Sequence, residues 1–335
     1  MTGGSTPPQH RAVLRVPAQE LPADRRPEPG PIAILPEPEE FFVAAVQDAG
    51  GEVAPLSDQT RGVIWLSNAR AREFTGILER YPGIGWVQLP WAGVDAFSGI
   101  FAPYSARPKP LWTSAKGAYA EPVAEHILAM TLALLRELPT RVVARGWGDK
   151  IGRSLFGLNV VVIGAGGIAI ELLRLLEPFR VQVTVVRRST EPLPGAERTI
   201  TSDHLHEVLP DADVVVVAAA LTGGTTRLIG AAELDAMKSS AILVNIARGG
   251  LVDTDALVVA LASGAIAGAG LDVTEPEPLP DGHPLWSEPR ALITSHSADT
   301  PEMTTPLLAE RVKTNVRAFL DHGRFEGVVD PEAGY

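Results

Sequence analysis

The segment from Val160 to Ala169 constrains the fold of this chain more than any other. Four apolar residues, Val160 to Ile163, lead into a glycine-rich turn, and an apolar helical pattern follows it. This order predicts a strand, a tight turn and a helix. In such a unit Gly164 permits the turn, Gly166 lets the backbone approach a pyrophosphate, and the small Ala169 lets the helix pack on the strand. The helix N-terminus then faces the phosphates, so the segment predicts a bound dinucleotide.

The sequence around this segment alternates short apolar runs with helical patterns. The expected strands are 32–35, 63–67, 85–89, 158–163, 181–186, 214–218, 241–245, 267–272 and 291–294, and the expected helices, besides the one after the glycine turn, are 41–49, 71–80, 121–138, 202–208, 231–237, 255–262 and 301–322. Such alternation is typical of parallel sheets covered by helices. It predicts a small early β/α layer and a later doubly wound sheet of about six strands.

Length and composition narrow the class of protein. A chain of 335 residues with 45% apolar content exceeds what one core usually fills, which favours two domains. The net charge of −11 disfavours nucleic acid and anionic membranes as partners. The sequence contains neither an apolar run long enough to span a bilayer nor a signal peptide, so we expect a cytoplasmic protein. Because it has no cysteine, it has no disulfide, thiolate metal site or cysteine nucleophile.

Three polar residues follow predicted strands of the later sheet. Arg248 comes after strand 241–245, Glu277 after the strand ending at 272, and His296 after the strand ending near 294. The carboxyl ends of parallel strands share one edge, and ligands bind there. A guanidinium can hold a substrate carboxylate in a fork. An imidazolium oriented by a carboxylate can protonate a developing alkoxide. The three residues beside a dinucleotide therefore predict hydride transfer to a 2-oxo acid.

Motifs spread over roughly residues 60 to 322 carry a family resemblance. They read QLPWAGVD (88–95), EPVAEH (121–126), the glycine turn, LVNIARGGLVD (243–253), LDVTEPEPLP (271–280), HPLW (283–286) and ITSH (293–296). The spacing from Arg248 to Glu277 is 29 positions, and that from Glu277 to His296 is 19. In these motifs and spacings the chain resembles the D-isomer-specific 2-hydroxyacid dehydrogenases, and most closely their glyoxylate/hydroxypyruvate reductase branch.

The resemblance implies a role for each matching residue. Arg248, Glu277 and His296 match the catalytic arginine, acid and histidine. The substrate-carboxylate loop is matched by Ala92, Gly93 and Val94, next to Trp91. The cofactor-binding positions, beside Gly164 and Gly166, are Gly167 and Ile168 at the pyrophosphate, Ile246 and Ala247 toward the nicotinamide, and Asp272 at the carboxamide. The implied activity is an NAD(P)-dependent reduction of small 2-oxo acids, such as glyoxylate or hydroxypyruvate, to D-2-hydroxy acids. The sequence offers no metal site.

The resemblance also implies the architecture. Two doubly wound α/β domains are expected, with a Rossmann-type dinucleotide-binding domain inserted into a smaller flavodoxin-like substrate domain. On this basis residues 1–30 form a flexible tail, 31–115 and 297–330 form the substrate domain, and 116–296 form the dinucleotide-binding domain. Members of the family are usually dimers joined through the helix equivalent to 121–138, which predicts a homodimer.

Departures from the family pattern bear on the cofactor. NAD-preferring members carry an aspartate 19 residues after the isoleucine of the turn, and Arg187 stands at that position here. Arg187 and Arg188, followed by Ser189, could hold a ribose 2′-phosphate. The sequence therefore predicts NADP, with NAD as the alternative. Two smaller departures are Ser295, where a proline is usual before the histidine, and the loop 220–222, which lacks the usual proline.

Several alternatives stay open at this level. Trp91 either shapes the substrate pocket or packs in an interface. His204 and His206 are interpreted as surface residues rather than metal ligands. A dinucleotide-sensing interaction protein, like the transcriptional corepressors on the same fold, is the competing function, but the complete set of Arg248, Glu277 and His296 argues against it. Glu277 also disfavours a formate dehydrogenase, which carries glutamine there.

Overall fold

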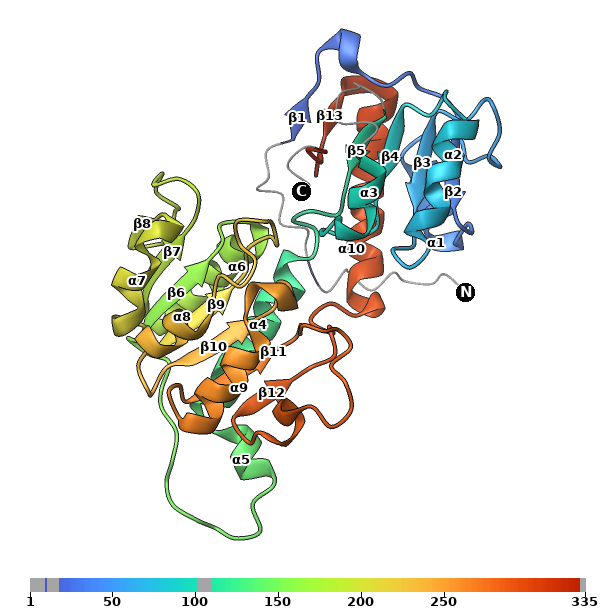
Figure 1. Ribbon diagram of the computed structural model, residues 1–335. Helices are drawn as coiled ribbons and strands as arrows, with labels where there is room; N and C mark the ends of the chain where they lie inside the picture. Colours follow the sequence, from blue (N-terminus) through green and yellow to red (C-terminus); the bar gives the residue numbers. More distant parts are fainter. Residues whose placement is uncertain (1–9, 11–17, 102–109, 332–335) are drawn as a thin grey trace, which may run out of the picture. The chain divides into compact units, whose positions relative to one another are not determined.

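The computed structural model describes residue 10, residues 18–101 and residues 110–331. The chain forms two compact units (Figure 1). The larger unit consists of residues 120–300, and the smaller unit combines residues 1–119 with 301–335. The larger unit is thus inserted between two segments of the smaller one. The predicted fold class, two α/β domains of which the larger is Rossmann-type, is confirmed.

One parallel sheet of seven strands forms the centre of the larger unit. Its strand order is β12 (Ala291–Ile293), β11 (Gly268–Leu271), β10 (Ile242–Asn245), β9 (Val214–Val217), β6 (Asn159–Ile163), β7 (Gln182–Val186) and β8 (Arg198–Ile200). Strands covered on both faces read as continuous apolar runs, and β9 is four buried valines. The sequence predicted six of these strands and missed the short edge strand β8, which carries only three residues.

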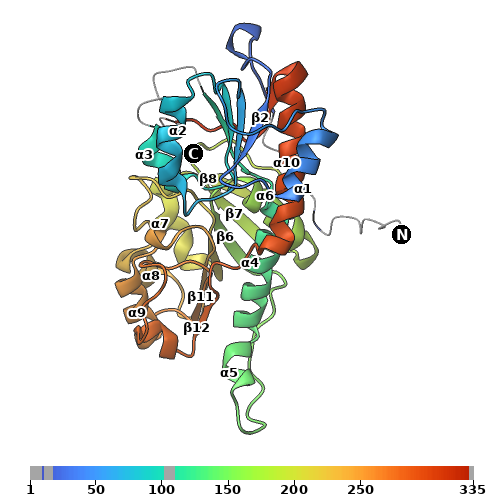
Figure 2. The same ribbon diagram turned by 90° about the vertical axis from the view of Figure 1, so that its right-hand side faces the viewer.

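Helices cover both faces of this sheet. Figure 2 shows α4 (Ala120–Leu135) and α6 (Gly167–Leu176) on one face and α7 (Leu205–Val208), α8 (Ala231–Ala236) and α9 (Thr254–Ser263) on the other. The predicted helix 121–138 is divided into α4 and α5 (Leu138–Val142), because Glu137 between them has a left-handed backbone with φ of 51°. Each of these helices, like every other helix in the described residues, is too short or too polar to span a membrane.

The smaller unit is built on a parallel sheet of four strands. Their order is β2 (Ile32–Leu35), β3 (Gly62–Trp65), β4 (Trp86–Gln88) and β5 (Leu111–Thr113). The helices α1 (Glu40–Asp48) and α10 (Pro301–Arg317) lie on one face, and α2 (Phe74–Arg80) and α3 (Ser98–Phe101) lie on the other (Figure 2). A π-helical turn, η10 (Ala318–His322), ends α10.

A buried polar network ties α10 to this sheet. The side chains of Asn315 and Gln88 are fully buried, and Asn315 Nδ2 donates to Gln88 Oε1 at 2.7 Å. Thr113 Oγ1 donates to the same oxygen at 2.9 Å, and Glu326 N donates to Asn315 Oδ1 at 2.8 Å. Buried polar groups stabilise a fold when they are hydrogen-bonded in this way. The network therefore fixes the last helix of the chain on the strand that leads to Trp91.

Part of the predicted N-terminal tail is ordered. The strand β1 (Gln19–Glu20) pairs antiparallel with β13 (Arg324–Phe325), and Leu21 N donates to Gly323 O at 3.0 Å. The sequence also contains a short apolar patch at 12–16 whose pattern is compatible with an edge strand, and these residues lie outside the described part of the chain. Pairing with a strand from the other end of the chain depends on the tertiary fold, which the local pattern does not contain.

Candidate active site

The strand ends of the larger unit line up in one row. Backbone pairing places Ile163 opposite Val217, Val217 opposite Asn245, Asn245 opposite Leu271, and Leu271 opposite Ile293. Each loop that follows a strand therefore starts from the same edge of the sheet. The glycine turn and the residues predicted as catalytic all belong to these loops, and this edge is the candidate active site.

The loop that carries Arg248 is held by Asn245. This side chain is 1% exposed at the end of β10, and its Nδ2 donates to Arg248 O at 3.0 Å while its Oδ1 accepts from Ala247 N at 3.1 Å. The guanidinium of Arg248 donates from Nη1 to Ala247 O at 2.7 Å. Ile246, between Asn245 and Ala247 in the sequence, is buried. Sequence reasoning did not assign Asn245 a role, although an amide that ends a buried apolar strand was a signal for one.

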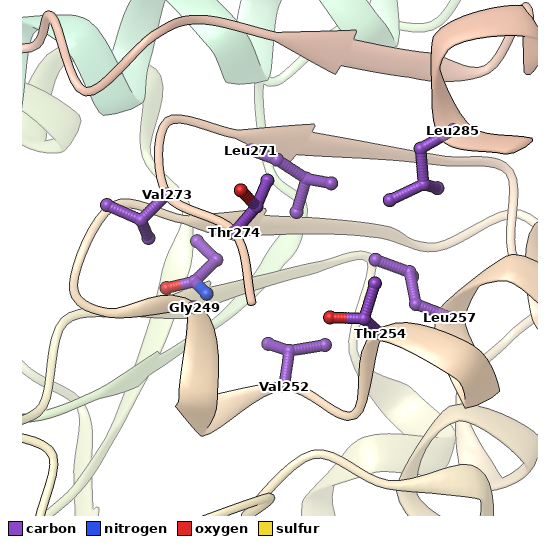
Figure 3. Close-up of a pocket in the computed structure, with 9 residues that line it drawn as sticks. Gly249, Val252, Thr254, Leu257, Leu271, Val273, Thr274 and Leu285 are labelled. Carbon is purple, nitrogen blue, oxygen red and sulfur yellow. The ribbon is translucent and has the colours of Figure 1, made fainter. Parts of the chain in front are cut away.

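Gly249 brings the loop of Arg248 against the loop of Glu277. A Cβ atom on Gly249 would lie 1.9 Å from Thr274 O and 2.5 Å from Glu275 N, so only glycine fits. Figure 3 shows Gly249 and Thr274 beside a small cavity that Val252, Leu257 and other residues line. The cavity measures about 10 Å³, which is room for one water molecule at most, so it is not the substrate pocket.

His296 and Glu277 form a pair. Nδ1 of His296 lies 2.7 Å from Oε1 of Glu277, and the two side chains are 43% and 41% exposed. A carboxylate at one ring nitrogen fixes the orientation of an imidazole and presents the other nitrogen, Nε2, to a ligand. The structure thus brings together two residues that the sequence places 19 positions apart, in the geometry of an oriented acid or base.

Asp272 anchors the loop that carries His296. The carboxylate is almost fully buried, and Oδ1 accepts from Thr294 Oγ1 at 2.6 Å and from Ser297 N at 2.9 Å, while Oδ2 accepts from Ala298 N at 3.2 Å. The backbone carbonyl of Asp272 accepts from His296 N at 2.8 Å. The resemblance assigns Asp272 to the cofactor carboxamide. In the structure this carboxylate is engaged by the loop 294–298.

A further carboxyl group belongs to this neighbourhood. Asp299 is mostly buried, and burial raises the pKa of its carboxyl group to about 6. The negative charge of Asp272 also raises this pKa, whereas the positive charges of His296 and Arg248 lower it. All three groups are close enough to act on one carboxyl. The structure therefore gathers Arg248, Asp272 and His296 electrostatically around Asp299, which sequence reasoning missed because no motif marks it.

The glycine turn has the features that a dinucleotide requires. Gly164 has φ of 119°, and a Cβ there would lie 2.4 Å from Ala218 O, so this position requires glycine. Gly166 precedes the first turn of α6, which begins at Gly167 and Ile168, and a Cβ on Gly166 would meet open space. Ala169 is fully buried against the sheet. Exposed backbone at a helix N-terminus fits a pyrophosphate.

Arg187 and Arg188 follow β7 on the same edge. Arg187 N donates to Ile200 O of β8 at 2.9 Å, and its guanidinium reaches Glu191 O at 3.4 Å. Arg188 and Ser189 are exposed. Two guanidinium groups and a hydroxyl are donors of the kind that bind phosphate.

Trp91, Ala92, Gly93 and Val94 belong to the smaller unit and are described within it. The ring of Trp91 meets that of Tyr119 edge-on with centroids 5.7 Å apart, and Tyr119 Oη donates to Pro90 O at 2.7 Å. Ala115 N donates to Trp91 O at 3.1 Å, and Val94 is buried. The loop is therefore held in place by its own unit.

His204 and His206 have carboxylate partners. Nδ1 of His204 lies 2.6 Å from Oε1 of Glu207, and Nε2 of His206 lies 2.8 Å from Oε1 of Glu233. Both histidines are exposed. The pair of His204 and Glu207 has nearly the same distance as that of His296 and Glu277 but follows β8, which is at the opposite end of the strand order from β12, so it offers an internal control.

Comparison with known proteins identifies the family. Residues 128–298, half of the chain, match the family described as D-isomer specific 2-hydroxyacid dehydrogenase, NAD binding domain. A glyoxylate reductase from Thermococcus gammatolerans is 30% identical over 291 residues, which are 84% of this chain and 83% of that protein. The chain belongs to the D-isomer specific 2-hydroxyacid dehydrogenase family. The predicted resemblance is thereby confirmed.

Other relatives agree with this family. A Corynebacterium melassecola protein named only for its place in the proB 3′ region is 38% identical over 276 residues, which are 80% of this chain and 88% of that protein. A D-isomer specific 2-hydroxyacid dehydrogenase from Xanthobacter autotrophicus, solved in complex with NADPH and MES, superposes with a TM-score of 0.78 at 27% identity and covers 92% of this chain and all of that one. This 2-hydroxyacid dehydrogenase is therefore an oxidoreductase, and a nicotinamide dinucleotide is the cofactor that its family supports.

Proposed function

We propose that this 2-hydroxyacid dehydrogenase reduces small 2-oxo acids, such as glyoxylate or hydroxypyruvate, to the D-2-hydroxy acids. One observation carries the proposal: the pair of His296 and Glu277, at 2.7 Å, follows strands of the same sheet edge as Arg248 and the glycine turn. A glyoxylate reductase among the relatives supports this substrate class.

The side chains at this edge have separate tasks in the proposal. Arg248 binds the substrate carboxylate and polarises the adjacent carbonyl. Glu277 holds Nδ1 of His296, and Nε2 of the protonated ring donates its proton to the carbonyl oxygen as that oxygen gains negative charge. A reduced nicotinamide dinucleotide, held at the glycine turn, would supply the hydride for this reduction. In the other unit, the backbone of Ala92, Gly93 and Val94 binds the substrate carboxylate, and Trp91 shapes the specificity for its side chain.

The proposed cofactor is NADPH. Gly164, Gly166, Gly167 and Ile168 provide the pyrophosphate site at the start of α6, and Ile246, Ala247 and Asp272 line the nicotinamide end. Arg187, Arg188 and Ser189 supply donors for a ribose 2′-phosphate. A carboxylate at position 187 would instead favour NADH, which has a free 2′-hydroxyl.

Exposed apolar residues support a homodimer as part of this proposal. Val142, Val143 and Trp147 of α5 and the loop after it are 78%, 70% and 92% exposed. Clustered apolar residues of this size mark an association surface. Sedimentation velocity is expected to give twice the chain mass, and Trp147→Ser to shift the species toward the monomer. A wild-type protein that sediments as a monomer at micromolar concentration would contradict the dimer.

The function is tested with His296→Ala and a matched control. Loss of a positioned proton donor is expected to lower kcat for glyoxylate or hydroxypyruvate with NADPH by about 10²- to 10⁴-fold. His204→Ala removes another histidine that has a carboxylate at Nδ1 and is expected to leave kcat unchanged. A wild-type protein without turnover on a panel of 2-oxo acids, or a fully active His296→Ala variant, would refute the proposal.

A further inference from the structure

The backbone of His296 is in a conformation that needs support. Its φ is 50°, which places a residue with a bulky side chain in the left-handed region. Such a conformation is strained for a residue with a Cβ atom and persists where surrounding contacts over-determine it. The contacts here are the amides of residues 296 to 298, all three of which donate to Asp272. The position of the His296 imidazole therefore depends on where Asp272 lies.

Asp272 is in turn connected to helix α4 through His126. Nε2 of His126 lies 3.0 Å from Thr294 Oγ1 and 3.6 Å from Asp272 Oδ1. Thr294 has one hydroxyl proton, and it donates this proton to Asp272 Oδ1 at 2.6 Å, because a carboxylate can only accept a hydrogen bond. The oxygen of Thr294 must then accept from His126, so Nε2 of His126 carries a proton. One chain of hydrogen bonds runs from α4 through Thr294 to the carboxylate.

We propose that His126 is a positioning residue for the His296 loop, acting through Thr294 and Asp272. The inference rests on the proposed function, in which His296 is the proton donor. By donating to Thr294, His126 directs the hydroxyl proton to Asp272 Oδ1 and leaves the other carboxylate contacts to the amides of Ser297 and Ala298. Without that donor, the Thr294 hydroxyl can rotate away and the buried carboxylate loses a fixed partner.

Packing of α4 does not require this histidine. The helix is buried on the sheet through Ile127, Met130 and Leu134, whereas the side chain of His126 is 23% exposed. Its polar contacts go to the loop at the end of β12, 168 positions further along the chain. A helix that only needed to pack here would have an apolar side chain at this position.

The test compares three substitutions with a control. His126→Ala removes the donor, His126→Gln keeps a side-chain NH2 at a similar reach, and Thr294→Val removes the bridging hydroxyl. Thr131→Val, a fully buried threonine of the same helix, controls for loss of a hydroxyl from α4. Each variant is assayed with glyoxylate or hydroxypyruvate and NADPH, and amide hydrogen exchange of Ser297 and Ala298 is measured without cofactor or substrate.

A positioning role predicts a specific pattern. His126→Ala and Thr294→Val are expected to lower kcat by about 10- to 100-fold with KM changed less than about threefold, because the donor is misplaced while Arg248 is not. Exchange at Ser297 and Ala298 is expected to accelerate at least about tenfold, while the amides of β11 keep their rates. His126→Gln is expected to restore most of both properties. Thr131→Val should match the wild type.

The outcomes separate this inference from the proposed function. If the wild type turns over 2-oxo acids and His296→Ala does not, the function stands. In that case wild-type kcat and wild-type exchange in both His126→Ala and Thr294→Val would overturn the role of His126. Amide exchange in His126→Ala that accelerates at β11 as much as at Ser297 and Ala298 would also overturn it. A His126→Gln variant that is as impaired as His126→Ala, with the same uniform acceleration of exchange, would overturn it as well. Both outcomes indicate general destabilisation of the fold.

Discussion

The two ends of the strand-end row are built differently. At the end formed by β10, β11 and β12, the loops are tied to one another: Asn245 holds the Arg248 loop, Gly249 touches the backbone of Thr274, and Asp272 binds three consecutive amides. At the end formed by β6 and β7, Gly166 borders open space and Arg188 is exposed.

The proposed function gives each end a different task. Proton transfer requires a side chain held to within about 0.5 Å, so its support must exist before the substrate arrives. In the proposed function, the phosphate oxygens of the dinucleotide accept hydrogen bonds from backbone amides and guanidinium groups at the other end, so the cofactor itself completes that part of the site. Substitutions at the tied end should therefore disturb structure and rate together, whereas those at the open end should change affinity alone.

Gly249→Ala is expected to have the largest effect. The new methyl group would overlap the backbone at Thr274, which cannot move as a flexible side chain could. We expect the free energy of unfolding to fall by about 3 kcal/mol and kcat to fall more than about 100-fold. Gly250→Ala is the control, because its methyl group would meet side-chain atoms that can move, those of Leu221 at 3.3 Å and Glu275 Oε2 at 3.9 Å. Equal stability of the two variants in urea denaturation would show that the two loops are not in tight contact.

The double substitution Arg187→Ala and Arg188→Ala tests the open end. Loss of two charged donors is expected to raise KM for NADPH by about 10- to 100-fold, with little change for NADH and none in the urea midpoint. Arg198→Ala, an exposed arginine of β8 paired with Glu207, is the control. A preference for NADH over NADPH in the wild type, or an equal rise of KM for both cofactors, would contradict the phosphate assignment.

Asp299→Asn tests the electrostatics of the tied end. Burial raises the folded-state pKa of Asp299 to about 6, above its ordinary value of 3.8. The carboxyl group therefore contributes stability below about pH 4, and this contribution is lost as the pH rises through 6. The wild type is expected to lose about 2 kcal/mol of unfolding free energy over that interval relative to Asp299→Asn. Asp281→Asn, at an exposed position, serves as the control. The prediction is wrong if the unfolding free energies of the wild type and Asp299→Asn change in parallel between pH 4 and pH 6.

Gly166→Ala should have a small effect on folding. Because a methyl group there meets open space, unfolding should change by less than about 0.5 kcal/mol. The Kd for NADPH, measured by fluorescence titration, should nevertheless rise about tenfold, because the methyl group occupies the space of the pyrophosphate. Gly76→Ala in α2, also facing open space, should leave the Kd unaltered. An unaffected Kd in Gly166→Ala would place the phosphates elsewhere.

Sequence alone predicted the fold class and the central strands, because β6 and β9 carry their own apolar pattern. It also pointed to Arg248, Glu277 and His296, because their motifs and spacing are local features of the chain. It did not identify Asn245 or Asp299, and it gave Asp272 a cofactor role without its contacts to residues 296–298. Those features depend on which loops meet at the sheet edge, and that juxtaposition arises only from the tertiary fold.

Because the larger unit lies between two segments of the smaller unit along the chain, the two units can be completed only in a certain order during synthesis. Residues 120–300 leave the ribosome as one continuous piece, so the larger unit can fold as soon as it emerges. The sheet of the smaller unit is synthesised before the larger unit but cannot be completed then, because Asn315 and Arg311, which satisfy its buried polar groups, are translated after residue 300. A nascent chain would thus contain a folded larger unit and a smaller sheet that α10 does not yet cover. During this interval the apolar face of that sheet is exposed, and chaperones would be most needed then.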